Sequence, residues 1–507
     1  MMLRVIIYQN STRILAWNQR NMKMKALEGI EPKKVFGFFE EITQIPHGSY
    51  NLEGIRKYLT DFAEKRNLEY IADDAGNVII KKTATNGYEN EPGVILQGHM
   101  DMVAVCEEGS GIDMKTHPLD VFIDGDLIGA KKTSLGGDDG IAVAMALAIL
   151  DSKDIPHPAL EVVITANEET GMEGASGLDI SNISFRRLIN IDSEDEGIFT
   201  VGCAGGARVY CNLETYDTPY ALNKTYELKI KGLIGGHSGQ MINKGRMNAC
   251  KAMGRILAKA CDPEGYSTLN SILGGSADNV IPSECTANVT IPLFYATEFE
   301  NKVNKEAELL KEEFSETDPD FEFTIDETDA DEEDNDISIS LQKVANLIDA
   351  FPNGVIKMSE DVEGLVQTSL NLGIVKCDNG AVTCEFSVRS SIAEEKEKLI
   401  DRLTDITEEN NGTYSISGDY PGWKYAVESP LRDKMVKVFR DMYAKEPKVE
   451  AIHAGLECGF FIDKAPDMDA VSFGPDMQDI HSPSERLSIS STARTYEYLL
   501  KVLATKD

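Results

Sequence analysis

The chain has 507 residues, of which 42% are hydrophobic, and its formal net charge at pH 7 is −35. This length exceeds that of one ordinary domain, so two domains are the natural expectation. The acidic surface disfavours nucleic acid and anionic membranes as partners, because both carry negative charge themselves. The sequence contains no run of 18 apolar residues, which argues against a transmembrane helix.

The first residues of the chain differ from the rest, because they carry basic side chains and no acidic one. They lack the long apolar core and the cleavage site of a secretory signal. We expect residues 1–23 to be a non-native or disordered N-terminal extension.

Strand and helix patterns alternate after this start. Apolar periodicity predicts helices between residues 32 and 66, with a break at 45–48. The later expected elements are strands at 77–80 and 93–97, a helix at 141–150, and strands at 160–166, 188–191 and 470–473. Strands that alternate with helices predict an α/β fold.

The pattern changes between residues 206 and 422. Strand-like runs at 225–230, 285–293, 373–376 and 381–389 surround helical stretches at 248–260 and 301–314. Two similar strand–helix–strand units would explain this order. The acidic stretch 315–337 is predicted to be a solvated loop, since it lacks the glycine-containing spacing of a calcium loop. The sequence thus predicts a catalytic domain in two parts, 24–205 and 423–507, interrupted by an inserted domain at 206–422.

The nine cysteines are an odd number, and no two of them have the C-x-x-C spacing. In a chain of this length the pattern favours reduced thiols over a disulfide framework. We therefore expect a cytoplasmic protein.

Polar side chains stand where several predicted strands end. They are His99 with Asp101, Asp138 with Asp139, Glu168 with Glu169, Asp192, and His481. Ligands of α/β sheets bind beyond the carboxyl ends of strands. Mixed imidazole and carboxylate ligands suit zinc, with cobalt or manganese as substitutes. A pair of metal ions needs a bridging carboxylate and about two further ligands for each ion, so the combination predicts a dinuclear site.

Each of these pairs has a structural explanation when it is taken alone. A single His-x-Asp sequence more often occurs by chance and has no function. Glu-Glu after a strand is commonly a solvent-facing turn. An acid before a helix usually caps it, so Asp139 is expected to be no more than the N-cap of the following helix.

Several segments carry a resemblance to a known family. LQGHMDMV, SLGGDDGIAVAMALAIL, ANEETGMEGASGLD, LINIDSEDEGIFTVGCAGG, IGGHSGQMINKGRMNA and GPDMQDIHSPSERL resemble the cytosol non-specific dipeptidases, also called aminoacyl-histidine dipeptidases or peptidase D. This family is a branch of the dinuclear zinc exopeptidases. The resemblance implies a zinc-exopeptidase-type catalytic domain with a mixed central sheet, interrupted by an inserted α+β lid domain.

The resemblance also implies which acid of each pair binds metal. The implied ligands are His99, Asp138 as the bridging ligand, Glu169, Asp192 and His481. Asp101 is implied to orient a ligand and Glu168 to act as general base. His237 matches a lid histidine that stabilises the tetrahedral oxyanion. The candidates for substrate binding are Asn279, Arg389, Gly455 and Glu457, of which arginine can grip a carboxylate with two parallel bonds.

We therefore expect two Zn²⁺ ions per chain, with Co²⁺ or Mn²⁺ as substitutes, and hydrolysis of dipeptides of broad or Xaa-His specificity. A related aminoacylase or carboxypeptidase is the main alternative. A catalytically inactive binding protein is disfavoured, because all five ligand positions and Glu168 are present. A dinuclear phosphoesterase would show more histidine ligands. The sequence leaves open whether the lid closes within one chain or supports a homodimer.

Overall fold

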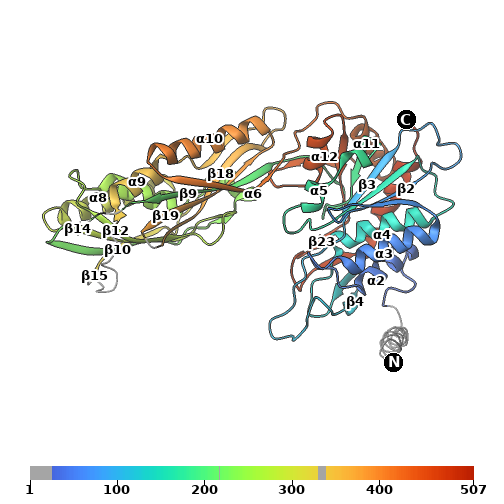
Figure 1. Ribbon diagram of the computed structural model, residues 1–507, viewed down its shortest axis with the longest axis horizontal. Helices are drawn as coiled ribbons and strands as arrows, with labels where there is room; N and C mark the ends of the chain where they lie inside the picture. The colour runs from blue at the N-terminus through green and yellow to red at the C-terminus, as the bar shows by residue number, and fades with distance from the viewer. Residues whose placement is uncertain (1–25, 216, 218, 329–338, 379) are drawn as a thin grey trace, which may run out of the picture. The chain divides into compact units, whose positions relative to one another are not determined.

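The computed structural model describes residues 26–215, 217, 219–328, 339–378 and 380–507 (Figure 1). The expected extension at 1–23 and residues 329–337 of the acidic stretch lie outside the described residues. Among the described helices, none is long and apolar enough to cross a membrane.

The chain forms two compact units. Unit 1 comprises the residues up to Phe199, Ser429–Lys448 and Asp467–Asp507, and unit 2 comprises Thr200–Glu428 and Val449–Pro466. The domain bounds 24–205, 206–422 and 423–507 stay predictions, since compactness does not test whether a segment folds as a domain.

A mixed sheet organises unit 1, with the strand order β1-β2-β6-β3-β7-β22. Its strands are β1 (Glu69–Ala72), β2 (Val78–Lys82), β3 (Val94–His99), β6 (Leu160–Thr165), β7 (Arg187–Asn190) and β22 (Asp469–Ser472). β3, β6, β7 and β22 run parallel to one another, whereas β2 is antiparallel to both of its neighbours, β1 and β6. The order continues with β8 (Ile198–Cys203) and β21 (Lys448–Ile452), each of which spans a boundary between the units.

The central strands of this sheet are apolar because both of their faces are covered. β3 and β6 are buried at every residue, as expected of parallel strands between helical layers. The helices of unit 1 are α2 (Lys33–Thr43), α3 (Glu53–Arg66), α4 (Gly137–Asp151), α5 (Glu173–Gly177), α11 (Pro430–Tyr443) and α13 (Ile489–Ala504), with a 3₁₀ turn at Ile180–Asn182. Figure 1 shows α2, α3 and α4 on the same side of the sheet.

A small antiparallel sheet also belongs to unit 1. It has the order β23-β24-β5-β4, with β4 (Val121–Asp124), β5 (Leu127–Ala130), β23 (Met477–Gln478) and β24 (Arg486–Ser488). The loop between β23 and β24 carries His481. This sheet therefore brings a segment near the C-terminus back to the start of α4.

Unit 2 contains a ten-stranded antiparallel sheet with the order β15-β10-β14-β12-β18-β19-β9-β20, with β16 beside β12 and β17 beside β18. Its strands are β9 (Gly205–Glu214), β10 (Asn223–Lys231), β12 (Thr268–Gly274), β14 (Cys285–Pro292), β15 (Glu322–Thr328), β16 (Ile339–Ser340), β17 (Gly354–Met358), β18 (Val366–Asp378), β19 (Ala381–Ser390) and β20 (Thr413–Tyr420). The expected strand–helix–strand units thus share one continuous sheet.

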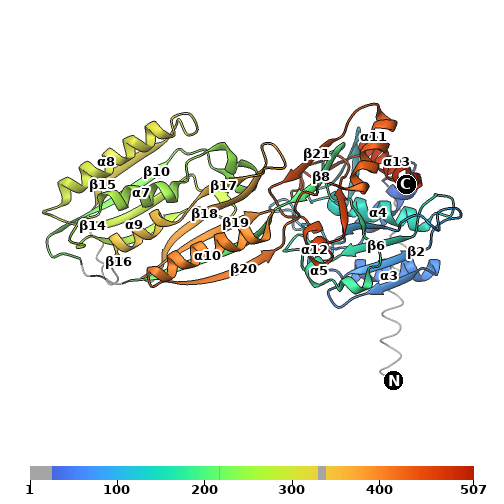
Figure 2. The ribbon, with the colours of Figure 1, turned by 90° about the horizontal axis from the view of Figure 1, so that it is seen from above.

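Helices cover one face of this sheet and enclose an apolar core between the two layers (Figures 1 and 2). They are α7 (Ala249–Ala260), α8 (Ala296–Glu313), α9 (Leu341–Ala350) and α10 (Ala393–Glu409). The shorter elements of unit 2 are β11 (Gly236–His237), α6 (Ser238–Met241), a 3₁₀ turn at Ile242–Lys244, β13 (Val280–Ile281) and α12 (Cys458–Lys464). β11 pairs with β13 outside the large sheet.

Candidate metal centre

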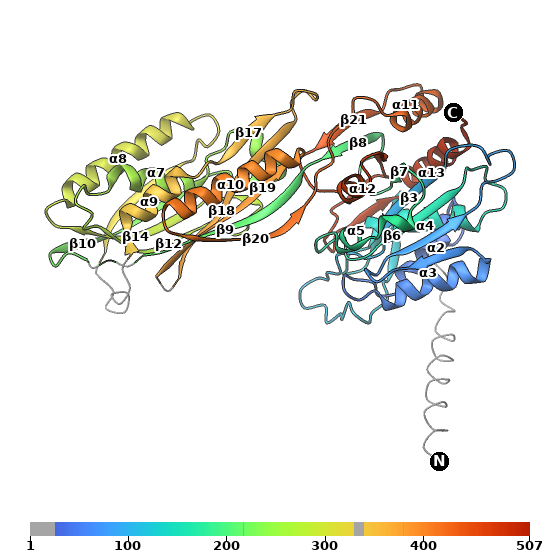
Figure 3. The same cartoon turned by 45° about the horizontal axis from the view of Figure 1, so that its top comes forward.

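The polar side chains of unit 1 converge because they follow neighbouring parallel strands. His99 is the last residue of β3 and pairs with Thr165, the last residue of β6. Gln97 of β3 pairs with Asn190, the last residue of β7. Residues that follow β6 and β7 therefore reach the same edge of the sheet as His99. Figure 3 lets the reader follow β3, β6 and β7 side by side.

Two groups of potential ligands at this edge share one carboxylate. His99, Asp138 and Asp192 form one group, and Asp138, Glu169 and His481 form the other, with the ligand atoms of each group within 4.8 Å of one another. The Nε2 atoms of His99 and His481 each lie 3.0 Å from Asp138, the first from Oδ1 and the second from Oδ2. The two oxygens of Asp138 therefore face two different histidines.

The remaining distances complete the two groups. His99 Nε2 lies 3.6 Å from Asp192 Oδ1, and His481 Nε2 lies 3.0 Å from Glu169 Oε2. The side chains of His99, Asp138, Glu169 and Asp192 are largely buried, whereas that of His481 is 44% exposed. The structure therefore brings together all five residues that are predicted from the sequence to be ligands.

The electrostatics of this cluster fit a site for cations. Burial, together with the nearby charges of Asp138 and Glu169, raises the pKa of Asp192 above its ordinary value. Hydrogen bonds to Asp138 and Glu169 raise the pKa of His481 to about 10, although burial opposes this. Glu169 Oε1 is buried and has no hydrogen-bond partner among the described residues. Three buried carboxylates and two imidazoles form a donor set that suits divalent metal ions.

Asp101 holds the loop that carries the glutamates. Its carboxylate accepts hydrogen bonds from the backbone N–H groups of Glu168 (3.0 Å) and Glu169 (3.3 Å) and from the hydroxyl of Ser49 (2.8 Å). His99 Nδ1 lies 3.1 Å from the backbone oxygen of Asp101 and 3.7 Å from its carboxylate. Because a carbonyl oxygen only accepts, Nδ1 carries the proton in the neutral ring and leaves the Nε2 lone pair toward the acids.

Glu168 lies on the same loop, directly before Glu169. One of its carboxylate oxygens, a nitrogen of His99 and an oxygen of Glu169 lie within 4.8 Å of one another. Asn167 begins this loop with a φ of 51°, a left-handed conformation that asparagine tolerates better than most residues. The turn directs both glutamates to the edge of the sheet where His99 ends β3.

The prediction that Asp139 caps the helix is wrong. The N-cap of α4 is Gly136, and Asp138 and Asp139 have non-helical backbone angles inside the element. The Asp139 carboxylate instead accepts a hydrogen bond from the backbone N–H of His99 at 3.1 Å. The side chain points back to β3 because Gly98 has no Cβ, and a Cβ there would lie 2.3 Å from Asp139 Oδ2.

Unit 2 holds a second polar cluster around Arg389 of β19. The Arg389 side chain is buried, its Nη1 donates to Tyr420 Oη at 3.3 Å, and its Nε has no hydrogen-bond partner among the described residues. Burial, together with the charge of Arg389, lowers the pKa of His237 and lowers that of His453 to about 4. His453 Nε2 lies 2.7 Å from Ser369 Oγ.

The other predicted residues of unit 2 have different environments. Asn279 precedes β13, and its backbone oxygen accepts the N–H of Ser238, which follows His237. Gly455 is half-buried, and Glu457 is completely buried next to α12. His453 had no assigned role, since a single histidine in a loop carries no sequence signal, and only the fold brings it to Arg389.

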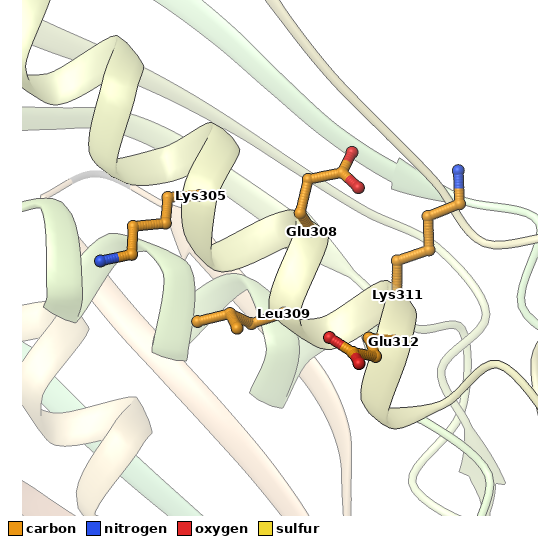
Figure 4. Close-up of a pocket in the computed structure, with 5 residues that line it drawn as sticks. All are labelled: Lys305, Glu308, Leu309, Lys311 and Glu312. Carbon is orange, nitrogen blue, oxygen red and sulfur yellow. The ribbon is translucent and has the colours of Figure 1, made fainter.

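A surface hollow along α8 is unrelated to these clusters. Its lining consists of Lys305, Glu308, Leu309, Lys311 and Glu312, all from one helix (Figure 4). None of these residues belongs to the metal-ligand groups or to the cluster around Arg389.

The sequence matches the model of peptidase family M20/M25/M40 over residues 95–505. The chain belongs to this family, and it is a hydrolase of the metallopeptidase class. It is 35% identical over 481 residues to the cytosol non-specific dipeptidase of Escherichia coli (strain K12), covering 95% of this chain and 99% of that protein. This result confirms the resemblance found in the sequence.

Solved structures agree with the fold. The crystal structure of aminoacylhistidine dipeptidase from Vibrio alginolyticus is 36% identical, with a TM-score of 0.88 and coverage of 95% of this chain and 98% of that one. Aminopeptidase PepT from Bacillus cereus ATCC 10987 shares the fold at 17% identity, with a TM-score of 0.54 over 94% of this chain and 98% of that one. The predicted α/β fold of the zinc-exopeptidase type is thus confirmed.

Proposed function

We propose that this protein is a dipeptidase with a dinuclear metal centre, zinc being the favoured metal. The observation that carries the proposal is the pair of ligand groups that share Asp138. Two metal ions that act together need one bridging carboxylate, and Asp138 directs its two oxygens to two different histidines. The relatives from Escherichia coli and Vibrio alginolyticus, both named as dipeptidases, support the choice of substrate.

The ligands would be His99 and Asp192 for one ion, Glu169 and His481 for the other, and Asp138 for both. When bound, the metal ions would lower the pKa of water and polarise a peptide carbonyl. Cobalt or manganese would fit the same donors.

Glu168 is proposed to be the general base and then the general acid. It lies beside the ligands and is not needed to complete either group that shares Asp138. Its carboxylate would take a proton from the attacking water and return it to the leaving amine. Asp101 would support both steps, because it fixes the backbone of Glu168 and Glu169 by accepting their N–H groups.

The cluster around Arg389 is proposed to recognise the substrate. Its buried guanidinium has an N–H group with no partner among the described residues, and arginine binds carboxylates with two parallel hydrogen bonds. His237 keeps one N–H when neutral, and burial favours that neutral state. It would donate this hydrogen bond to the oxygen that becomes negative during attack. Asn279, Gly455 and Glu457 stay candidates for contacts with the rest of the peptide.

A substrate panel on the zinc-loaded enzyme tests this function. The panel contains free dipeptides, including Xaa-His, their C-terminal amides, tripeptides and N-acetyl amino acids. We expect hydrolysis of free dipeptides, a raised KM for the amides, and loss of all activity after chelation with recovery on adding zinc. Preferred hydrolysis of N-acetyl amino acids would instead favour an aminoacylase, and chelator-resistant hydrolysis would contradict a metal-dependent reaction.

Metal binding should release protons and weaken as the pH falls. In the metal-free protein the pKa of His481 is raised to about 10, so below that pH its proton must leave before the ring can bind a cation. The protonated ring stabilises the metal-free fold fully below the ordinary histidine pKa of 6.5, and this contribution is lost as the pH rises through about 10. Calorimetric titration with zinc at pH 8, in buffers of different ionisation enthalpy, should therefore reveal proton release. Identical heats in all buffers would contradict this.

We also propose a cytoplasmic location. All nine cysteines are free thiols in the structure, and the Escherichia coli relative is named as a cytosol enzyme. A homodimer stays a prediction, to be tested by sedimentation of the purified protein.

A further inference from the structure

The carboxylate of Glu485 is buried against the start of α4. Glu485 is only 2% exposed, and its carboxylate accepts hydrogen bonds from four consecutive backbone N–H groups. Oε2 accepts from Leu135 (2.7 Å) and Gly136 (3.1 Å), whereas Oε1 accepts from Gly137 (2.7 Å) and Asp138 (3.4 Å).

These N–H groups form a cradle for an anion. Gly136 has a φ of 68°, and a left-handed residue in a backbone turn can direct successive N–H groups toward one point. The first N–H groups of a helix also lack partners within the helix. Gly136, the N-cap residue of α4, has no side chain that could accept these N–H groups, so Glu485, which lies 347 residues after Asp138 in the sequence, performs this role.

The cradle includes the shared ligand itself. Asp138 has a ψ of 106°, which is not helical, and its two oxygens face His99 and His481. The N–H of Asp138 and those of the three preceding residues are all bound to Glu485, which limits rotation of the backbone that carries the ligand.

Glu485 also connects this backbone to a second ligand. It lies four residues after His481, and its own N–H donates to the backbone oxygen of Ser482 at 3.1 Å. His481 has a φ of 60°, an uncommon conformation that the surrounding contacts must maintain. One carboxylate therefore joins the segment of Asp138 to the segment of His481.

We propose that Glu485 is a positioning residue of the metal centre, which keeps the bridging ligand Asp138 at a fixed position relative to His481. This inference rests on the proposed function, since it assumes that Asp138 and His481 bind metal. Glu485 is proposed neither to bind metal nor to touch substrate. It acts through the four backbone N–H groups, and its negative charge compensates their partial positive charge.

The test compares three variants with the wild-type enzyme. Glu485→Gln keeps the side-chain size but replaces one accepting oxygen by an N–H₂ group that faces donors. Glu485→Asp keeps the charge at a shorter reach. Glu161→Gln is the matched control, because Glu161 is equally buried and accepts N–H groups of Ser184 and Phe185, but near the amino end of β6 and away from the ligands.

We expect Glu485→Gln to lower zinc affinity about 10- to 100-fold, as measured by competition with a chromophoric chelator. Its kcat should fall while KM for the dipeptide changes little, and the cobalt-substituted protein should show an altered visible spectrum. Glu485→Asp should recover part of the affinity. Glu161→Gln should lower Tm without changing zinc affinity or the cobalt spectrum.

Two results would overturn the inference. One is a Glu485→Gln variant with wild-type zinc affinity and cobalt spectrum, and the other is an equal loss of affinity in Glu161→Gln, which would show a general effect of stability. If Glu485→Gln does not fold, Glu485→Asp replaces it, and a Glu485→Asp variant with a lowered Tm but wild-type zinc affinity and cobalt spectrum would overturn the inference. Failure of the wild-type chain to bind two zinc ions would instead contradict the proposed function.

Discussion

The Glu168→Gln variant should bind two zinc ions as tightly as the wild-type enzyme and hydrolyse dipeptides roughly 10²- to 10⁴-fold more slowly. Glutamine has nearly the same size as glutamate but cannot take a proton from water. Neither of the two ligand groups that share Asp138 includes Glu168, so both groups stay complete in the variant. Steady-state kinetics and metal analysis of the same protein batch measure both quantities.

The neighbouring residue provides the control for this prediction. Glu169→Gln should lose activity together with zinc, because Glu169 Oε2 belongs to a ligand group and lies 3.0 Å from His481. If Glu168→Gln keeps near-normal activity with both ions bound, Glu168 is not the general base. If it loses zinc as readily as Glu169→Gln, then Glu168 is a ligand and the assignment within the pair must be reversed.

Removal of Asp138 should have a larger effect on the metal content than removal of any other ligand. Asp138→Ala takes a donor from both groups, whereas Asp192→Ala takes a donor from one. We expect Asp138→Ala to retain less than one equivalent of zinc after dialysis and to have no measurable activity. Asp192→Ala should retain about one of two equivalents, since the group of Asp138, Glu169 and His481 stays complete.

Metal analysis of the dialysed proteins measures this difference, and circular dichroism checks that both variants are folded. Both side chains are largely buried, with 9% and 12% exposed for Asp138 and Asp192, so the two replacements disturb the fold to a similar degree. Equal stoichiometry in the two variants would contradict a shared ligand. It would indicate one metal ion, or two ions bound at independent sites.

Much of the metal centre could be predicted from the chain because its residues follow apolar strands. The apolar runs of β3 and β6 predict buried strands from the sequence, and parallel strands bring their carboxyl ends to one edge of the sheet. His99 and the pair Glu168 and Glu169 could therefore be placed at that edge in advance. Local pattern did not separate the members of a pair, since adjacent acids share the same sequence environment.

Other contacts could not be predicted from the local sequence. Asp139 has the sequence pattern of a helix cap, yet its carboxylate binds the backbone of His99, because Gly98 leaves space for it. Glu485 looks like a surface acid after a proline-containing loop, yet it occupies the N–H cradle at the start of α4. Both outcomes depend on backbone groups that come from distant parts of the chain.

The sequence by itself determined the chemistry of this protein: the imidazoles and carboxylates, their positions after buried strands, and the family to which the chain belongs. These properties are local, because a strand and the residue that follows it are adjacent in the chain. Only the tertiary structure decided that Asp138 faces both histidines, since His481 lies 343 residues after it. Hydrogen bonds between such distant segments form only when packing brings them together, and for that reason the shared ligand and its support by Glu485 emerged from the fold.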